Sequence, residues 1–386
     1  MSLYLKYRPQ KFGEVKGQEH IVQTLKNALK QGKIGHAYLL TGSRGLGKTT
    51  VARLIAKAVN CQQSTINKQQ STRLRQGFHL RPAERGFGGQ VGGQANNRRV
   101  DGYKLEVEGC DSEPCVNCDS CQEIAEGRAL DVLEIDAASN RGIEEIRELR
   151  EKIKFAPSSF PYKVYIIDEV HMLTKEAFNA LLKTLEEPPT HAIFILATTE
   201  AHKVPLTIQS RCQRLDFRRP SSDELSGHLQ GVAEKEKINL SPGAARLLSD
   251  LANGSFRDGL SLLDQIAGGR QHIGDEINEE GVRRLLGLAE EKLVTEFVDC
   301  VLAKDIQAAW RLIGGFYQAG GDLLNFSQSI IGQLRRKMIE SQDFQLAGII
   351  DIFVKAANEL KYSSISTLPL ELAVVEATVR IKNYEV

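Results

Sequence analysis

Short apolar runs alternate with amphipathic stretches along the first 220 residues of the chain. Short apolar runs predict strands at 37–40, 132–135, 163–167 and 192–196, and a further strand is predicted at 213–217. Apolar residues recur at helical spacing in 49–60, 141–155 and 174–187, which predicts helices between the strands. This alternation favours a parallel sheet with helices on both faces, so we predict an α/β fold for this part.

The pattern changes after Pro220. Ser221 or Ser222 is suited to cap a new helix, and beyond it apolar residues recur at helical spacing with almost no strand signal. Glycine pairs at 268–269 and 320–321 interrupt this all-α pattern. We therefore predict an α/β domain at 1–220, a small helical domain at 221–284 and a second helical domain at 285–386.

One segment fits neither pattern. Residues 62–109 are rich in Gln, Asn, Arg and Gly and hold few apolar side chains, so we predict a flexible insertion. The segment is basic because it carries several arginines, namely Arg73, Arg75, Arg81, Arg85, Arg98 and Arg99. Two interpretations stay open for it, namely contact with DNA or an acidic partner and a solvated insertion without a function.

The composition and charge of the chain exclude few classes of function. The 386 residues carry 50 Lys and Arg against 49 Asp and Glu, a formal charge of +1, so contact with nucleic acid requires a local basic patch. No apolar run approaches the length of a membrane span, and the first residues lack the apolar core of a signal peptide. We expect a cytoplasmic protein with no membrane contact.

Residues 42–49 match the pattern G-x-x-x-x-G-K-T between a predicted strand and a predicted helix. In this setting glycines let the backbone curl around a phosphate chain, and the helix start adds the positive end of its dipole. Lys48 is expected to reach the β- and γ-phosphates and Thr49 to hold Mg²⁺. The predicted nucleotide contacts of this loop are Gly42, Ser43, Arg44, Gly45, Leu46, Gly47, Lys48, Thr49 and Thr50.

Asp168 and Glu169 end another apolar strand, at the edge where α/β sheets bind their ligands. Asp168 is suited to bind Mg²⁺ through water, and Glu169 is suited to deprotonate a water aimed at the γ-phosphate. A threonine hydroxyl at the end of the next strand is placed to contact that water or phosphate. Thr199 is the preferred candidate and Thr198 is the alternative.

Arg211 precedes the last predicted strand and carries a planar donor fork that suits phosphate, although its spacing does not say whose phosphate it meets. With Ser210-Arg211-Cys212, Asp168-Glu169-Val170-His171 and Gly254-Ser255-Phe256-Arg257-Asp258, the chain resembles the ATPase subunit of the bacterial DNA polymerase III clamp loader, the gamma/tau family. Arg8-Pro9, the residues at 15–20 and the run at 178–189 extend this resemblance over nearly the whole chain.

The resemblance implies an AAA+ P-loop NTPase fold with a helical lid domain and a helical collar that assembles subunits into a five-membered ring. By this likeness Arg211 is an arginine finger for the ATP of the neighbouring subunit, and Arg257 is the lid arginine for the γ-phosphate of its own ATP. Arg8, Pro9 and Val15 would lie near the adenine. The implied function is ATP-driven loading of a sliding clamp onto primed DNA during replication, together with other clamp loader subunits.

Cys115, Cys118 and Cys121 place three thiols close together, and one more thiolate completes a tetrahedral metal site. Cys61 and Cys110 are the candidates. The family resembled carries a four-cysteine zinc module whose first cysteine follows an Asn, as it does here at Cys61, so Cys61 is preferred for Zn²⁺. The insertion at 62–109 departs from the family spacing, and an iron–sulfur cluster is the alternative to zinc.

The remaining candidates receive structural interpretations. Cys212 and Cys300 are predicted to be small core residues. His171 is interpreted as a structural or coupling histidine, because Glu169 already supplies a base. Trp310 lies in a helical stretch, where it is expected in the core or at an interface.

Two other functions stay open at this point. One is a different AAA+ ring ATPase that acts in branch migration or helicase loading, and the cysteine cluster argues against it. The other is a non-catalytic ring subunit that only binds partners. The complete set of Lys48, Thr49, Asp168 and Glu169 argues against that second function.

Overall fold

The computed structural model describes residues 2–61, 113–140, 142–269 and 276–384. The predicted insertion at 62–109 and Cys110 lie outside these residues. The chain divides into two compact units, residues 1–229 with 249–262 and residues 230–248 with 263–386.

A parallel sheet in the order β2-β3-β4-β1-β5 forms the centre of the first unit. Its strands are β1 (Ala37–Thr41), β2 (Val132–Asp136), β3 (Lys163–Asp168), β4 (Ala192–Thr198) and β5 (Gln213–Asp216). The register pairs Asp136 with Asp168, so two carboxylates meet at the carboxyl edge of the sheet. The predicted strands and the α/β class are thereby confirmed.

The central strands β1, β3 and β4 are buried on both faces of the sheet, as their unbroken apolar runs predict, whereas the edge strands β2 and β5 are more exposed. Successive side chains of a strand point to opposite faces, and Tyr38 and Ile166 pack on one side while Leu39 and Tyr165 pack on the other. Tyr165 also stacks on Phe194, with ring centroids 5.5 Å apart. Packing on both faces of the sheet fixes the position of its carboxyl edge.

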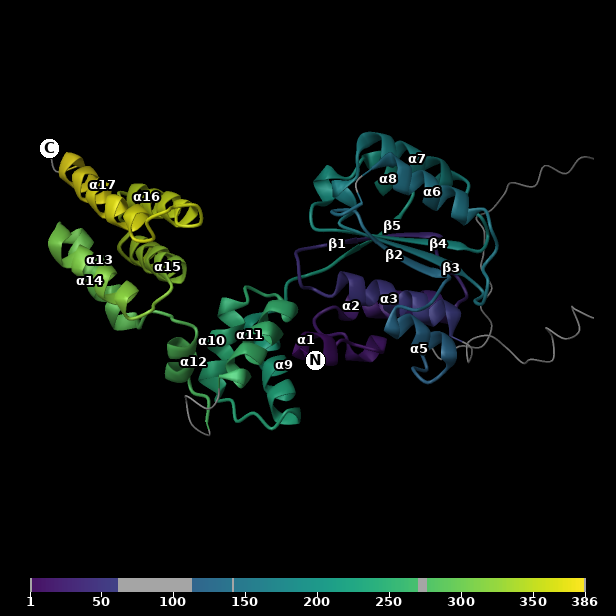
Figure 1. The fold of residues 1–386 in the computed structure, drawn as a ribbon, viewed down its shortest axis with the longest axis horizontal. Helices are drawn as coiled ribbons and strands as arrows, with labels where there is room; N and C mark the ends of the chain where they lie inside the picture. Colours follow the sequence, from purple (N-terminus) through teal and green to yellow (C-terminus); the bar gives the residue numbers. More distant parts are fainter. Residues whose placement is uncertain (1, 62–112, 141, 270–275, 385–386) are drawn as a thin grey trace, which may run out of the picture. The chain divides into compact units, whose positions relative to one another are not determined.

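Helices cover each face of the sheet in Figure 1, with α2, α3 and α5 on one side and α6, α7 and α8 on the other. The helical elements before β5 are α1 (Leu3–Lys6), η1 (Phe12–Glu14), α2 (Glu19–Lys30), α3 (Lys48–Asn60), α5 (Asp119–Glu126), α6 (Ile143–Ile153), η2 (Val170–Met172), α7 (Lys175–Glu186), η3 (Ala201–Lys203) and α8 (Leu206–Gln209). The helices predicted at 49–60, 141–155 and 174–187 correspond to α3, α6 and α7.

Every named element after β5 in the described ranges is a helix, as predicted. They are α9 (Ser222–Lys235), α10 (Pro242–Leu251), α11 (Phe256–Gly268), α12 (Glu279–Leu285), α13 (Glu291–Leu302), α14 (Ile306–Gln318), α15 (Leu323–Ser341), α16 (Leu346–Glu359) and α17 (Leu368–Tyr384). Ser221 caps α9, because its Oγ accepts the Glu224 N–H at 3.1 Å while Glu224 accepts the Ser221 N–H at 2.8 Å.

The core of the second unit is built by α13 to α17. Phe297 packs edge-on against both Phe326 and Phe353. Trp310 on α14 is 44% exposed, and its indole N–H donates to the Glu371 carbonyl at 3.1 Å. This exposure excludes the core interpretation of Trp310 and leaves the interface interpretation.

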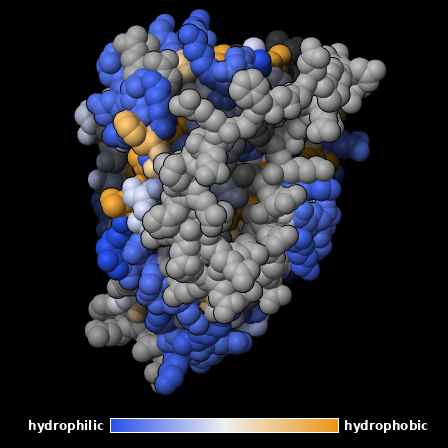
Figure 2. All heavy atoms as spheres, turned by 90° about the vertical axis from the view of Figure 1, so that its right-hand side faces the viewer, coloured by the Kyte–Doolittle hydropathy of each residue, from blue (hydrophilic) through white to orange (hydrophobic). Residues whose placement is uncertain are grey.

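The predicted domain boundary near residue 284 falls within α12, and the three-domain division stays a prediction. Within the described ranges, no helix combines the length and the apolar character that a membrane span needs. Figure 2 shows one face of the molecule, on which the described side chains are mainly hydrophilic with few hydrophobic ones among them.

Candidate nucleotide-binding site

The loop between β1 and α3 depends on glycine at several positions. Gly42, Gly45 and Gly47 have φ angles of 144°, 78° and 92°, a region that other residues rarely adopt. A Cβ on Gly42 would lie 2.8 Å from the Cβ of Phe217. The loop therefore needs glycine both for its left-handed turns and for close packing against the segment after β5.

Lys48 begins α3 and turns back over the loop. Its side chain is 6% exposed, and Nζ donates to the carbonyls of Gly42 at 2.7 Å and Ser43 at 2.8 Å. Burial lowers the pKa of Lys48, and the carboxylates of Glu169 and Asp168 oppose this shift. The ammonium group is thus held at the mouth of the loop, between carbonyls that a phosphate group could replace.

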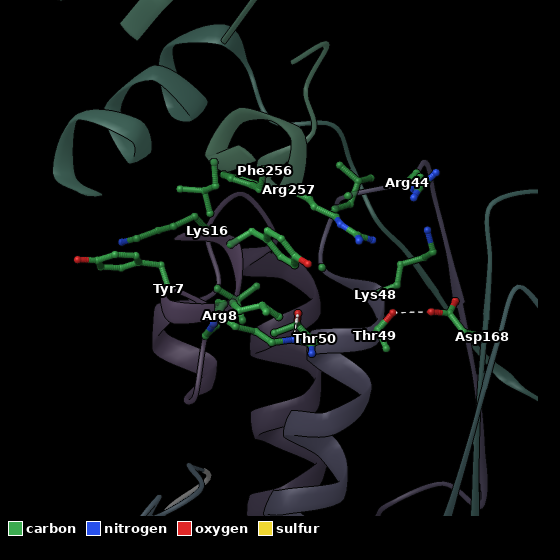
Figure 3. Close-up of a pocket in the computed structure, with 18 of the residues that line it drawn as sticks. Tyr7, Arg8, Lys16, Arg44, Lys48, Thr49, Thr50, Asp168, Phe256 and Arg257 are labelled. Atoms are coloured by element: carbon green, nitrogen blue, oxygen red, sulfur yellow. Dashed lines mark hydrogen bonds between the residues drawn. The ribbon is translucent and has the colours of Figure 1, made fainter. Parts of the chain in front are cut away.

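Thr49 and Asp168 meet directly. The Thr49 hydroxyl donates to Oδ2 of Asp168 at 2.6 Å, and this bond is drawn in Figure 3. Both side chains offer oxygen atoms, which Mg²⁺ prefers, and both line the same pocket. The pair fits a magnesium ion on the evidence of its donor chemistry.

Glu169 and Thr199 form a second pair beside the loop. Glu169 adopts a left-handed backbone with φ 46°, and its Oε2 accepts the Thr199 N–H at 3.1 Å and the Thr199 hydroxyl at 3.0 Å. Thr198 is fully buried and contacts Nδ1 of His171 at 3.0 Å instead. His171 lies 3.4 Å from both Glu169 and Glu200, which agrees with its interpretation as a coupling histidine.

These groups border a pocket of about 620 Å³ in the first unit. Predicted site residues that line it are Arg8, Pro9, Val15, Arg44, Gly45, Leu46, Gly47, Lys48, Thr49, Thr50, Asp168, Glu169 and Arg257. Figure 3 shows Lys48, Thr49 and Asp168 at one end, Tyr7, Arg8 and Lys16 at the other, and Arg257 entering from α11. The pocket has a phosphate-binding end and a separate end walled by the N-terminal segment.

Arg8 belongs to the N-terminal wall. Its Nε donates to the Thr50 hydroxyl at 3.1 Å, and burial lowers the pKa of its guanidinium group. Arg257 lies over the ring of Tyr4, 5.1 Å from its centroid. The wall and the start of α11 are therefore linked by a cation–π contact across the pocket.

Several lining residues escaped the sequence reasoning, above all Asp136. It ends β2 as Asp168 ends β3, and its carboxylate accepts the Ala138 N–H at 2.8 Å and the Ser139 hydroxyl at 2.9 Å. The shared edge of parallel strands was the signal that could have found it. The other unpredicted lining residues are Tyr4, Leu5, Tyr7, Glu14, Lys16, Ala138, His228, Phe256 and Leu260.

Arg211 lies outside this pocket. Its guanidinium forms an ion pair with Glu186 at 2.7 Å and donates to the Thr207 carbonyl at 2.7 Å. Gly42, Ser43 and Thr199 do not line the pocket either, but they contact Lys48 or Glu169, which do. One predicted site residue, Arg211, is thus unconnected to the nucleotide pocket of its own chain.

Four cysteines gather at the far end of α3. Their Sγ atoms lie within 4.8 Å of one another, with 3.9 Å between Cys61 and Cys118 and 4.0 Å between Cys115 and Cys121. Sulfur atoms bound to zinc at about 2.3 Å stand roughly 3.8 Å apart, so the cluster has the size of a tetrahedral zinc site. Cys61 fills the fourth position for which the sequence left two candidates.

The other described cysteines lie apart from this cluster. Cys212 packs against the core of the first unit, where burial raises its pKa to about 12, and Cys300 packs against the core of the second unit. Within the cluster, burial raises the pKa of Cys121.

Comparison with known proteins shows which protein families this chain resembles. A family described as DNA polymerase III, delta subunit, matches residues 17–79 and 105–221, and one described as DNA polymerase III clamp loader subunit, ATPase lid domain, matches residues 224–271. DNA polymerase III subunit tau of Bacillus subtilis is 37% identical over 97% of this chain and 62% of its own length. DNA polymerase III subunit gamma of Buchnera aphidicola subsp. Acyrthosiphon pisum is 37% identical over 86% of this chain and 77% of its own.

Among solved structures, the RuvB Holliday junction branch migration motor of Thermotoga maritima covers 76% of this chain and 79% of its own. It is 17% identical with a TM-score of 0.48, values too low to support a shared function.

The parallel sheet, the glycine loop after β1, the paired acids after β3 and the helices that follow define a P-loop nucleotide-binding protein of the AAA+ class. Sequence identity then gives the family within this class. The chain belongs to the DNA polymerase III gamma/tau family and spans 62% of the length of the tau subunit of Bacillus subtilis.

Proposed function

We propose that this chain is the ATP-hydrolysing subunit of a DNA polymerase clamp loader, which opens a sliding clamp and loads it onto primed DNA during replication. The observation that carries the proposal is the convergence of Lys48, the Thr49–Asp168 pair and the Glu169–Thr199 pair on one pocket of a gamma/tau chain. ATP is the proposed substrate and Mg²⁺ its companion ion.

The residues divide the chemistry between them. Lys48 neutralises the β- and γ-phosphates, while Thr49 and Asp168 hold the ion, which supplies Lewis-acid polarisation of phosphate oxygens when bound. Glu169 takes the proton from the water that attacks the γ-phosphate, and the oxygen of that water forms the new bond to phosphorus as the bond to ADP breaks. Thr199 orients Glu169, since its amide and hydroxyl already bind that carboxylate.

The two arginines have different proposed roles. Arg257 enters the pocket of its own chain and senses the γ-phosphate, whereas Arg211 acts on the ATP of a neighbouring subunit. The distance of Arg211 from its own pocket supports this division, because its ion pair with Glu186 leaves it on another surface. Hydrolysis is then conditional on assembly.

The cysteine cluster is proposed to hold structural Zn²⁺. The four sulfur positions at Cys61, Cys115, Cys118 and Cys121 have the spacing that a tetrahedral ion requires, and four thiolates leave no open position for chemistry. An iron–sulfur cluster is disfavoured because no Cys-Pro follows Cys121.

Partners and location belong to the same proposal. We expect other clamp loader subunits in a five-membered ring, a sliding clamp and primed DNA, all in the cytoplasm where replication proceeds. A different AAA+ ATPase for branch migration or helicase loading is disfavoured by the family matches. A non-catalytic ring subunit is disfavoured because Lys48, Thr49, Asp168 and Glu169 all line one pocket, and a subunit that only binds partners has no need of all four.

The test is the ATPase rate of the assembled complex with and without sliding clamp and primed DNA. We expect clamp and primed DNA together to raise the rate, and clamp with unprimed single-stranded DNA to raise it less. A rate that ignores both partners contradicts a clamp loader and points to another AAA+ function.

A further inference from the structure

Glu113 connects the cysteine cluster to the N-terminal segment of the chain. It lies two residues before Cys115, and its Oε2 accepts the Phe12 N–H at 2.7 Å while its Oε1 accepts the Gly13 N–H at 3.1 Å. Lys26 on α2 forms an ion pair with the same carboxylate at 2.5 Å. One side chain therefore bonds two backbone amides that are about 100 residues away in the sequence.

The residues that Glu113 bonds, Phe12 and Gly13, directly precede three residues that line the nucleotide pocket. Phe12 is fully buried, the Val15 N–H donates to the Phe12 carbonyl at 3.2 Å, and Val15 lines the pocket together with Glu14 and Lys16. Only the short helix η1 separates the Glu113 carboxylate from the pocket lining.

A second tether runs from α3 to the same segment. Lys57 is 2% exposed and its Nζ donates to Oε1 of Gln10 at 2.5 Å, while the Gln10 N–H donates to Glu14 at 2.6 Å. Lys57 lies one turn before Cys61, and the end of α3 packs on α5, which carries Cys121. Both tethers thus start beside cysteines of the cluster and end on the residues at 10–14.

This wall stands away from the phosphate-binding end of the pocket. Figure 3 shows Tyr7, Arg8 and Lys16 on the side opposite to Lys48 and Asp168. If ATP binds as proposed above, with phosphates at Lys48, the wall faces the base and ribose. The inference that follows rests on that proposed function.

We propose that Glu113 is a positioning residue that couples the cysteine cluster to the base-side wall, so that metal at the four cysteines strengthens nucleotide binding. Metal fixes the residues around Cys115 and with them the Glu113 carboxylate. That carboxylate fixes η1, which sets the position of Val15. Because coupling between two sites is reciprocal, bound nucleotide also slows the loss of metal.

The first experiment compares the nucleotide affinity of the zinc-loaded parent protein with that of zinc-loaded Glu113→Ala. Fluorescent analogues of ATP and ADP are the probes. Glu113→Ala is expected to raise the dissociation constant about 3- to 10-fold, as for lost hydrogen bonds to a part-exposed carboxylate. The rise should be equal for ATP and ADP, since the wall does not touch the γ-phosphate. In steady state KM rises with little change in kcat.

Two further variants control this experiment. Glu126→Ala removes the same charge from the same module, where Glu126 contacts only the exposed Arg128 among described partners, and should bind nucleotide like the parent protein. Glu113→Gln keeps one amide acceptor and should give an intermediate affinity. If circular dichroism shows that Glu113→Ala is unfolded, the affinity of Glu113→Gln tests the proposal instead.

The second experiment measures amide hydrogen exchange without nucleotide, in a peptide that covers residues 10–16. Exchange should rise in Glu113→Ala and, by a similar amount, in the parent protein after zinc is chelated. Chelation of Glu113→Ala should raise exchange less than chelation of the parent protein, because only the Lys57–Gln10 tether then remains to be loosened.

Unchanged affinity and unchanged exchange in both Glu113 variants overturn the proposal. A loss that grows from ADP to ATP also overturns it, because that loss belongs to the phosphate end. If the parent protein binds no ATP at all, the proposed function fails instead, while the exchange experiment still reports whether the cluster holds the wall.

Discussion

At the residue scale, the polar side chains at the phosphate end of the pocket hydrogen-bond to other groups of the same chain. Lys48 bonds loop carbonyls, Thr49 bonds Asp168, and Glu169 bonds Thr199. A bound nucleotide with its ion would exchange these partners for phosphate, metal and water. These hydrogen bonds hold the polar side chains at the pocket before a ligand arrives, and we expect each residue to have a separable role.

Lys48→Met should weaken ATP binding at least about tenfold, as for loss of a charged hydrogen-bonding partner. Glu169→Gln is the matched contrast, because it should abolish hydrolysis and leave ATP affinity nearly unchanged. Equilibrium binding and phosphate release measured on both variants separate the two roles. Equal loss of ATP affinity in both variants contradicts the assignment.

The pH dependence of stability follows from the buried ammonium group of Lys48. Burial lowers the pKa of Lys48 in the folded protein, so the unfolded protein binds more protons between that pKa and 10.5. The cost of burying the charge is present below the folded pKa and disappears as pH rises through this window. Urea unfolding from neutral pH to about pH 10 should therefore show the parent protein gaining stability relative to Lys48→Met. A constant difference contradicts this.

The residues predicted for the phosphate end could be singled out from the sequence because they follow one another along the chain or end a strand. It named Lys48, Thr49, Asp168 and Glu169, and the structure brings all four to one pocket. Tyr4 and Tyr7 escaped because nothing in their local sequence marks a binding residue. Asp136 ends a predicted strand, as Asp168 does, but only the sheet order puts the two strands side by side. They reach the pocket only through the fold.

At the scale of elements, the glycine loop lies against the start of α11. A Cβ on Gly45 would stand 1.9 Å from Oγ of Ser255, whose hydroxyl accepts the Asp258 N–H at 3.2 Å and so caps the helix that carries Arg257. The glycine loop at 42–49 thus touches the start of the helix that carries Arg257, the proposed lid arginine. Resemblance suggested their common role, but only the fold reveals the contact.

Gly45→Ala should lower the free energy of unfolding by about 1–3 kcal/mol more than Gly47→Ala. Both glycines have positive φ, but a Cβ on Gly47 meets nothing within 4 Å, so Gly47→Ala is the control for backbone strain alone. Adding Ser255→Gly should recover part of the loss in Gly45→Ala. Chemical denaturation measures all of these, and equal losses at the two glycines would refute the close approach.

The cysteine module should bind one zinc ion per chain. Cys121→Ser should lose that zinc, while Cys212→Ser should retain it, because Cys212 packs against the sheet core away from the cluster. Elemental analysis of purified variants measures the zinc content. Full zinc content in Cys121→Ser would contradict the tetrahedral site.

The elements themselves were predictable because their signals are local. The central strands β1, β3 and β4 are apolar runs with almost every residue buried, and α9 begins at the Ser221 capping box. The approach of Cys61 to Cys118 was not predictable from spacing, since residues 62–109 separate them in the sequence. It follows from the packing of α3 on α5.

At the scale of the whole molecule, one arginine of the predicted site does not line the pocket of its own chain. Arg211 is held by Glu186, away from the nucleotide pocket. Trp310 and Leu372 leave apolar surface exposed on α14 and α17. These features support the proposal that the chain functions in an assembly with other subunits.

Arg211→Ala subunits and Glu169→Gln subunits should each be inactive alone and should regain hydrolysis when mixed in one assembly. The Arg211→Ala subunit keeps its base, and a Glu169→Gln neighbour supplies the finger, whose contribution to rate is about 10³ to 10⁵. Arg214→Ala is the control, because Arg214 pairs with Asp216 nearby. A mixture that stays inactive would mean that Arg211 acts in its own chain or not at all.

The central claim is that this chain uses ATP to place a sliding clamp on primed DNA. The most direct measurement counts labelled clamps retained on circular primed DNA after a reconstituted complex is incubated with ATP. We predict closed clamps on the circles with the parent chain and almost none with Lys48→Met or without ATP. Equal retention with and without ATP, or active hydrolysis that leaves no clamp on the DNA, would contradict the claim.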